Sequence, residues 1–97
     1  MNKVKRLLIL GAGPEQCIAI NEAKDLGYKV FIADGNSDAM GLKDNENSYV
    51  TDISNKTEVL KLSKKLNIDG IFCHGVEIPE TVAYVGNYLG LPCLKEK

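Results

Sequence analysis

A glycine-rich turn near the start of the chain is the first feature whose residue types and spacing could do chemistry. Gly11 and Gly13 supply two glycines of the pattern G-x-G-x-x-G, which wraps a dinucleotide pyrophosphate, but the third position holds Gln16. Glycines permit a tight turn, and the helix that follows favours an anionic group at its N-terminus. Gln16 is bulky where the third glycine allows close packing, and Glu15 adds a negative charge. The turn is a candidate binding element; a turn required only by the topology is the alternative.

An acidic residue stands at the position where a dinucleotide-binding domain carries its ribose ligand. Asp34 lies 23 residues beyond Gly11, close to the usual offset of roughly 20 residues. The alternative is that Asp34 begins the turn Asp34-Gly-Asn, where its carboxylate bonds the local backbone. Both interpretations place the carboxylate at the tip of a strand beside the glycine turn.

Two further candidates follow a later strand. His74 comes directly after the apolar run 70–73, and Glu77 opens a predicted helix. Glu77 would project into the same crevice from the side opposite Glu15 and Gln16, so that together they could hold an ammonium or amide group. An acid at a helix start also suits the helix dipole, and a lone histidine also serves as a polar loop residue. These structural roles stay open.

Composition excludes several classes of partner. The chain has 12 basic and 13 acidic residues, so no positive field gathers a nucleic-acid backbone. No apolar run approaches the roughly 18 residues of a membrane span. Cys17, Cys73 and Cys93 are an odd number without the short, regular spacing of zinc ligands. We therefore expect no metal site, no nucleic acid and no membrane, in a reduced, cytoplasmic setting.

Strands and helices alternate along the whole chain. The predicted strands are 6–10, 29–33, 48–51 and 70–73, with a fifth able to begin at 91–94; the predicted helices are 15–26, 56–66 and 76–89. Right-handed crossovers then require an open, parallel, doubly wound α/β sheet of three layers, in the order 3-2-1-4 with any fifth strand outside the fourth. We predict a single Rossmann-like domain over residues 1–97, with a crevice above the ends of strands 1 and 4.

Apolar spacing predicts which side of each helix meets the sheet. The inward residues are expected to be Ile18, Ala19, Ala23 and Leu26; Val59, Leu62, Ser63 and Leu66; and Ile78, Val82, Val85 and Leu89. Tyr84 and Tyr88 share one helical face, and packing is their expected role. The polar segment 35–47 is expected to be a loop.

The ordered set of these segments resembles the N-terminal domain of ATP-grasp ligases, often called the pre-ATP-grasp domain. The superfamily includes carbamoyl-phosphate synthase large chains, biotin carboxylases and enzymes of purine synthesis. The matching pieces are LILGAGPEQCIAINEAKDLGYKVFIADGNSDAMG, SYVTDISN and IDGIFCHGVEIPETVAYVGNYLGLP, which cover nearly the whole chain. Asp34-Gly-Asn36-Ser37 and Gly90-Leu91-Pro92 stand where this family has an Asp-x-Asn-like phrase and a closing Leu-Gly-Leu-Pro.

The resemblance implies a carboxylate–amine ligation in which ATP and Mg²⁺ form an acyl phosphate that an amine then attacks. In such enzymes two later domains grip ATP, and the N-terminal domain contributes one wall of the acceptor-substrate pocket. Carried over, the binding candidates are Gly11, Gly13, Glu15, Gln16, His74 and Glu77, with Asp34 beside them. The expected ligand is a small carboxylate or amine, and no catalytic residue is expected.

One departure from the family is the end of the chain at Lys97, where the ATP-gripping domains would begin. We therefore expect no ligase activity from these 97 residues alone, with no cofactor of their own and with ATP and Mg²⁺ held by ATP-grasp domains in cis or in trans. Two alternatives compete. One is a stand-alone NAD- or nucleotide-binding module, against which the missing third glycine argues. The other is an interaction domain whose apolar surface favours a homodimer.

Overall fold

The computed structural model describes residues 4–43, 45, 47–73, 79–91 and 93–94. The strands in this part of the chain are β1 (Arg6–Leu10), β2 (Lys29–Asp34), β3 (Ser48–Val50), β4 (Gly70–Cys73) and β5 (Cys93–Leu94). The helices are α1 (Pro14–Asp25), α2 (Met40–Lys43), α3 (Lys56–Leu66) and α4 (Pro79–Leu89). The predicted strands and the three longer helices are confirmed, most of them to within one or two residues.

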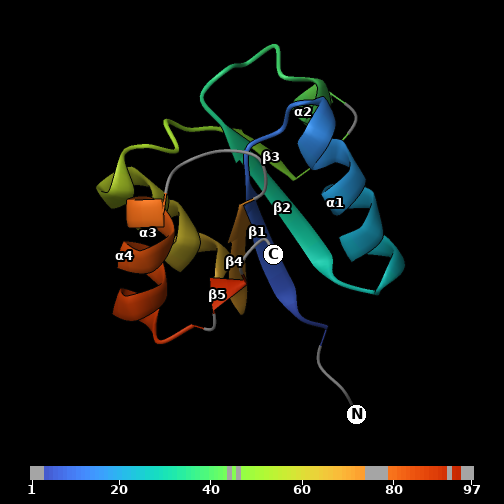
Figure 1. The fold of residues 1–97 in the computed structure, drawn as a ribbon. Coiled ribbons are helices and arrows are strands. Elements are labelled where there is room, and N and C mark those ends of the chain that lie inside the picture. The colour runs from blue at the N-terminus through green and yellow to red at the C-terminus, as the bar shows by residue number, and fades with distance from the viewer. Residues whose placement is uncertain (1–3, 44, 46, 74–78, 92, 95–97) are drawn as a thin grey trace.

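The strands form one parallel sheet in the order β3-β2-β1-β4-β5, as predicted from the sequence (Figure 1). Strand β1 lies in the middle, and the winding direction reverses there because β2 and β4 pair with its two sides. Leu10 is aligned with Ala33 of β2 and with Cys73 of β4. Three neighbouring strands therefore end at one edge of the sheet, which is where a doubly wound fold binds ligands.

Helices cover both faces of the sheet, which makes three layers (Figure 1). Alternate residues of β1 point to opposite faces, as in any strand. Leu8 and Leu10 join a buried cluster with residues of α3 and α4, whereas Leu7 and Ile9 join a second cluster with residues of α1. The helices α3 and α4 therefore share one face, and α1 lies on the other together with α2.

The inward sides of α3 and α4 agree with the prediction. Val59, Ser63 and Leu66 are buried, and Leu62 packs partly buried against the same cluster. Val82 and Val85 are buried in α4, and Leu89 packs against them. The rings of Tyr84 and Tyr88 contact each other, with centroids 6.2 Å apart. Ile78 and the expected opening of this helix at residue 76 lie outside the described residues.

The predicted inward side of α1 is confirmed at Ala23 and wrong at Ile18 and Leu26, and Ala19 is partly buried. Ile18 is 66% exposed and Leu26 is 77% exposed, while Gln16, Ile20 and Ala23 are buried. Gln16 turns inward because its side chain caps the glycine turn, and Ile20 and Ala23 follow it on the same side at helical spacing. Ile18 is two residues from both Gln16 and Ile20, about 200° around the helix, so it faces solvent.

The segment 35–47 is not only a loop, because it contains α2. Four residues are too few to show a helical period in a sequence, and Gly41 within them weakens the local helix propensity. The backbone N–H of Gly41 donates to the carbonyl oxygen of Ala12 at 2.6 Å, so the position of α2 is set by the glycine turn.

None of the described helices combines the length and apolar character needed to cross a membrane.

Candidate site at the carboxyl edge of the sheet

The edge where β1, β2 and β4 end brings the first group of predicted site residues together. The turn at 11–13 leaves β1 there, and Asp34 is the last residue of β2 beside it. Helix α1 begins directly after the turn, so its positive dipole end lies at the same edge. The topology therefore joins two segments that are about twenty residues apart in the chain.

The glycine turn has a backbone that is strained for other residues at its first position. Gly11 has a φ of 100°, in the region that L side chains rarely adopt. Gly13 has an ordinary φ of −73°, but a Cβ atom there would lie 2.9 Å from Oε1 of Gln16. The first glycine is required by the shape of the turn, whereas a side chain at the second would displace the end of Gln16.

The backbone N–H groups of this turn are bonded within the protein. The N–H of Gly11 donates to the carbonyl oxygen of Ala33 at 2.7 Å, and that of Gly13 donates to Oε1 of Gln16 at 2.8 Å. Between them, the N–H of Ala12 donates to Oδ2 of Asp34 at 2.8 Å. In a dinucleotide cradle, N–H groups at this kind of turn point at the pyrophosphate. Here those of residues 11–13 already have acceptors, and the next residue, Pro14, has no N–H.

Both carboxylate oxygens of Asp34 are engaged by backbone. Besides the bond from Ala12, the N–H of Asn36 donates to Oδ1 at 2.8 Å. The bond to Asn36 is the local turn that the sequence allowed as one interpretation of Asp34. The predicted strand order places Asp34 beside the glycine turn, but the sequence does not show that its carboxylate accepts the N–H of Ala12. Asp34 therefore fastens the glycine turn to the neighbouring strand.

The two polar residues that open α1 have different surroundings. Gln16 is only 5% exposed and lies over the turn that it caps. Glu15 is exposed in the first turn of α1, and no described residue forms an ion pair with its carboxylate. Of this pair, Glu15 is therefore the side chain that is placed to reach a ligand at the edge.

A clamp on Ala12 completes the support of the turn. Its N–H donates to Asp34, and its carbonyl oxygen accepts the N–H of Gly41 at 2.6 Å. A Cβ atom at Gly41 would lie 3.0 Å from both Cβ and the carbonyl oxygen of Ala12. Sequence reasoning missed this contact. The glycine inside a polar segment was the available signal, because a close backbone approach is a common reason for glycine.

The second group of predicted residues, His74 and Glu77, lies outside the described residues. Cys73 is described and ends β4 at the same edge, aligned with Leu10. Among the residues that the structure describes, no group of three or more His, Cys, Asp and Glu side chains could hold a metal ion.

No family model matches the sequence. Formate-dependent phosphoribosylglycinamide formyltransferase from Prochlorococcus marinus subsp. pastoris is 34% identical over 92 residues, which are 95% of this chain and 21% of that protein. The crystal structure of phosphoribosylglycinamide synthetase from Anaerococcus prevotii superposes with a TM-score of 0.78 at 32% identity, covering 93% of this chain and 23% of that one. The chain thus spans between a fifth and a quarter of the length of these relatives.

An NAD-bound enzyme shares the fold at much lower identity. The Bordetella bronchiseptica enzyme WbmG in complex with NAD superposes with a TM-score of 0.76 at 13% identity, covering 97% of this chain and 37% of that one. This likeness concerns the fold alone, which hosts unrelated functions. The residues at the glycine turn, and not the sheet, therefore distinguish a nucleotide-binding site from another kind of site.

Proposed function

We propose that the chain is the substrate-side domain of an ATP-dependent ligase, because its relatives match it with the N-terminal portions of ATP-grasp enzymes of the phosphoribosylglycinamide formyltransferase type. In this proposal the carboxyl edge of the sheet forms one wall of a pocket for an amine-bearing acceptor. An acceptor of the kind named in its relatives, phosphoribosylglycinamide, is our first candidate. From the family resemblance we also propose an acceptor like that of carbamoyl-phosphate synthase as a further candidate, and a cytoplasmic setting.

The observation that carries the proposal is the internal bonding of the glycine turn. The N–H groups of residues 11–13 are bonded to Ala33, Asp34 and Gln16, which argues against a pyrophosphate on this turn. The same bonds make the turn rigid, so that Glu15 is presented from a fixed base at the edge. An exposed carboxylate at this position suits an ammonium or amide group better than it suits a phosphate.

Each site residue then has a separate role in the proposal. Gly11, Gly13, Gln16 and Asp34 shape and fasten the turn, while Glu15 contacts the amine of the acceptor. Glu77 and His74, which follow β4 in the sequence, are proposed to contact the acceptor from the other side of the edge. Such a wall would orient the amine, which lowers the entropy cost of its attack.

ATP and Mg²⁺ fit poorly on the described residues, because no carboxylate cluster could hold the metal and the turn's N–H groups are occupied. We therefore assign both to ATP-grasp domains, in cis or in trans. When bound there, they supply phosphorylation of the carboxylate and neutralise the transferring phosphoryl group. The 97 residues alone are then expected to show no ATP hydrolysis with candidate substrates.

A ligand titration followed by amide NMR tests the proposal. We expect phosphoribosylglycinamide to shift the signals of residues 11–16 and 34–36 saturably, with millimolar affinity because only one wall of the pocket is present. Glu15→Gln should weaken this binding about tenfold, equivalent to about 1.4 kcal/mol. Glu22→Gln, at another exposed glutamate of α1, is the matched control and should bind like the unaltered chain. Micromolar binding of NAD at the same signals would instead favour the nucleotide-binding alternative.

A further inference from the structure

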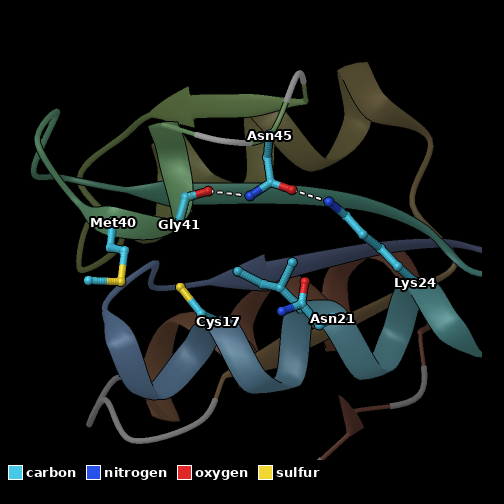
Figure 2. Close-up of a pocket in the computed structure, with 7 residues that line it drawn as sticks. Cys17, Asn21, Lys24, Met40, Gly41 and Asn45 are labelled. Carbon is cyan, nitrogen blue, oxygen red and sulfur yellow. Dashed lines mark hydrogen bonds between the residues drawn. The ribbon is translucent and has the colours of Figure 1, made fainter.

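A cavity of about 260 Å³ lies between α1 and the segment that contains α2. Cys17, Ile20 and Lys24 line it from α1, and Met40, Gly41 and Asn45 line it from the opposite side (Figure 2). The α1 residues are spaced by three and four, so they form one stripe along the helix. The stripe includes neither Glu15 nor any other residue that the proposed function assigns to substrate, so the cavity is a second feature of the molecule.

One end of the cavity holds an ammonium group in a defined position. Nζ of Lys24 donates to Oδ1 of Asn45, and Nδ2 of Asn45 donates to the carbonyl oxygen of Gly41 at 2.5 Å (Figure 2). Because an ammonium only donates, this chain of bonds sets which way the amide of Asn45 points. Lys24 and Asn45 therefore mark one polar end of the cavity.

The charge of the cavity favours an anion. Lys24 is the charged residue of the lining, and no carboxylate within the described part of the chain forms an ion pair with it. The bond from Lys24 ends on a neutral amide, and Lys24 is exposed to solvent. Asn21, one turn before Lys24 on the same stripe, adds a second amide that can bond a carboxylate oxygen.

The other end of the cavity is apolar and contains two sulfur-bearing side chains. Ile20 is buried in its floor, Met40 is 55% exposed at its rim, and Cys17 points from α1 into the space between the two elements (Figure 2). A flexible thioether adapts to the shape of an apolar ligand. The volume is below the roughly 300–1,000 Å³ of pockets for drug-sized molecules, so the ligand must be small.

We propose that this cavity binds a small monocarboxylate with a short apolar chain. The carboxylate would lie at Lys24 and Asn21, and the chain would lie over Ile20 between Met40 and Cys17. The inference does not rest on the proposed function, because none of the residues that the proposed function assigns to the acceptor lines this cavity.

A titration of the 97-residue chain with butyrate, followed by amide NMR, tests the proposal, with butyramide as the uncharged analogue. We expect butyrate to shift the signals of residues 17–24 and 40–45 saturably in the millimolar range, and butyramide to bind at least about tenfold more weakly. Lys24→Met should weaken butyrate binding about tenfold or more. Lys65→Met removes an exposed lysine from α3, on the opposite face of the sheet, and should leave the affinity unchanged.

Alkylation of the cysteines gives a second readout that does not depend on a variant. Butyrate should slow the reaction of iodoacetamide with Cys17, measured on separated peptides, and should leave the rate at Cys73 on β4 unchanged. Equal binding of butyrate and butyramide, unchanged affinity in Lys24→Met, or no saturable shift of the α1 and α2 signals up to about 100 mM would each overturn the proposal.

Discussion

Among the described residues, the two faces of the sheet carry buried clusters of different size. The face under α3 and α4 carries the larger buried cluster, to which both helices contribute regular apolar stripes. The face under α1 carries a smaller cluster, and two cavities flank that helix. One is the polar cavity beside α2, and the other, of about 200 Å³, lies over Leu7, Ile9 and Phe72.

The comparison shows for which helices the spacing of apolar residues predicts the buried side. A helix that covers its share of a sheet must turn its apolar stripe inward, and α3 and α4 do so. Helix α1 instead buries Gln16, Ile20 and Ala23, and Gln16 also accepts the N–H of Gly13 at the first turn. Its exposed Ile18 and Leu26 follow from that orientation. We call the face under α3 and α4 the closed face and the face under α1 the open face. The closed face is expected to contribute most of the free energy of unfolding, and the open face is expected to carry the binding elements.

The largest expected effect contrasts two isoleucines. Ile71 is 0% exposed in the cluster of the closed face, and Ile71→Ala should lower the free energy of unfolding by about 2–5 kcal/mol. Ile18→Ala on α1 removes the same side-chain atoms, which are exposed to solvent there. It should change the free energy of unfolding by less than about 0.5 kcal/mol. Urea unfolding of both variants provides the measurement. Equal losses would show that Ile18 is covered in solution and that the two faces do not differ in this way.

A smaller effect is expected at the contact between α2 and the glycine turn. The added Cβ of Gly41→Ala would lie 3.0 Å from Ala12, so that α2 and the glycine turn would have to move apart. This should lower the free energy of unfolding by about 1–3 kcal/mol. Gly35→Ala is the matched control, because its Cβ would lie no closer than 3.7 Å to the backbone oxygen of Thr51. Thermal unfolding measures both. An unaltered midpoint for Gly41→Ala would mean that α2 does not need to lie so close to the turn.

The smallest effect concerns the loop that enters α3 on the closed face. The O–H and N–H of Ser54 donate to Oδ1 of Asp52 and hold the pKa of that carboxyl below its ordinary value of 3.8. The lowered pKa means that Asp52 contributes stability above pH 3.8, and that this contribution is lost as the pH falls through the folded-state pKa. As the pH falls from 5 to 2, the urea midpoint of the unaltered chain should therefore decrease slightly more than that of Asp52→Asn, which lacks this carboxylate. Ser54→Ala should show the same reduced loss, and an unchanged pH profile in both variants would contradict the role of these bonds.

Much of the fold could be predicted because its signals are local. Aliphatic runs such as 6–10 and 70–73 predict buried parallel strands, and the rule of right-handed crossovers then restricts the possible strand orders to a few. The candidate site was predictable in part for the same reason. The residues that follow a strand can be read directly, so Gly11, Glu15 and Asp34 were assigned to the edge before their contacts were known.

The partners of those residues could not be predicted, because they come from other elements. The bond from Ala12 to Asp34 joins β1 to β2, and the bond from Gly41 to Ala12 joins α2 to the turn. The pairing of Lys24 with Asn45 likewise spans two elements. None of these bonds has a fixed sequence separation, so no spacing rule reveals them.

The amino-acid order alone settled the succession of strands and helices and the class of the sheet, and it predicted the edge at which a ligand would bind, because each depends on short-range preference and on chain handedness. The folded arrangement settled how α1 is rotated, that the glycine turn bonds to its own protein, and that a second cavity opens beside α2. Those outcomes depend on side-chain packing and on contacts between segments that are distant in the chain, and only the assembled structure brings those groups together.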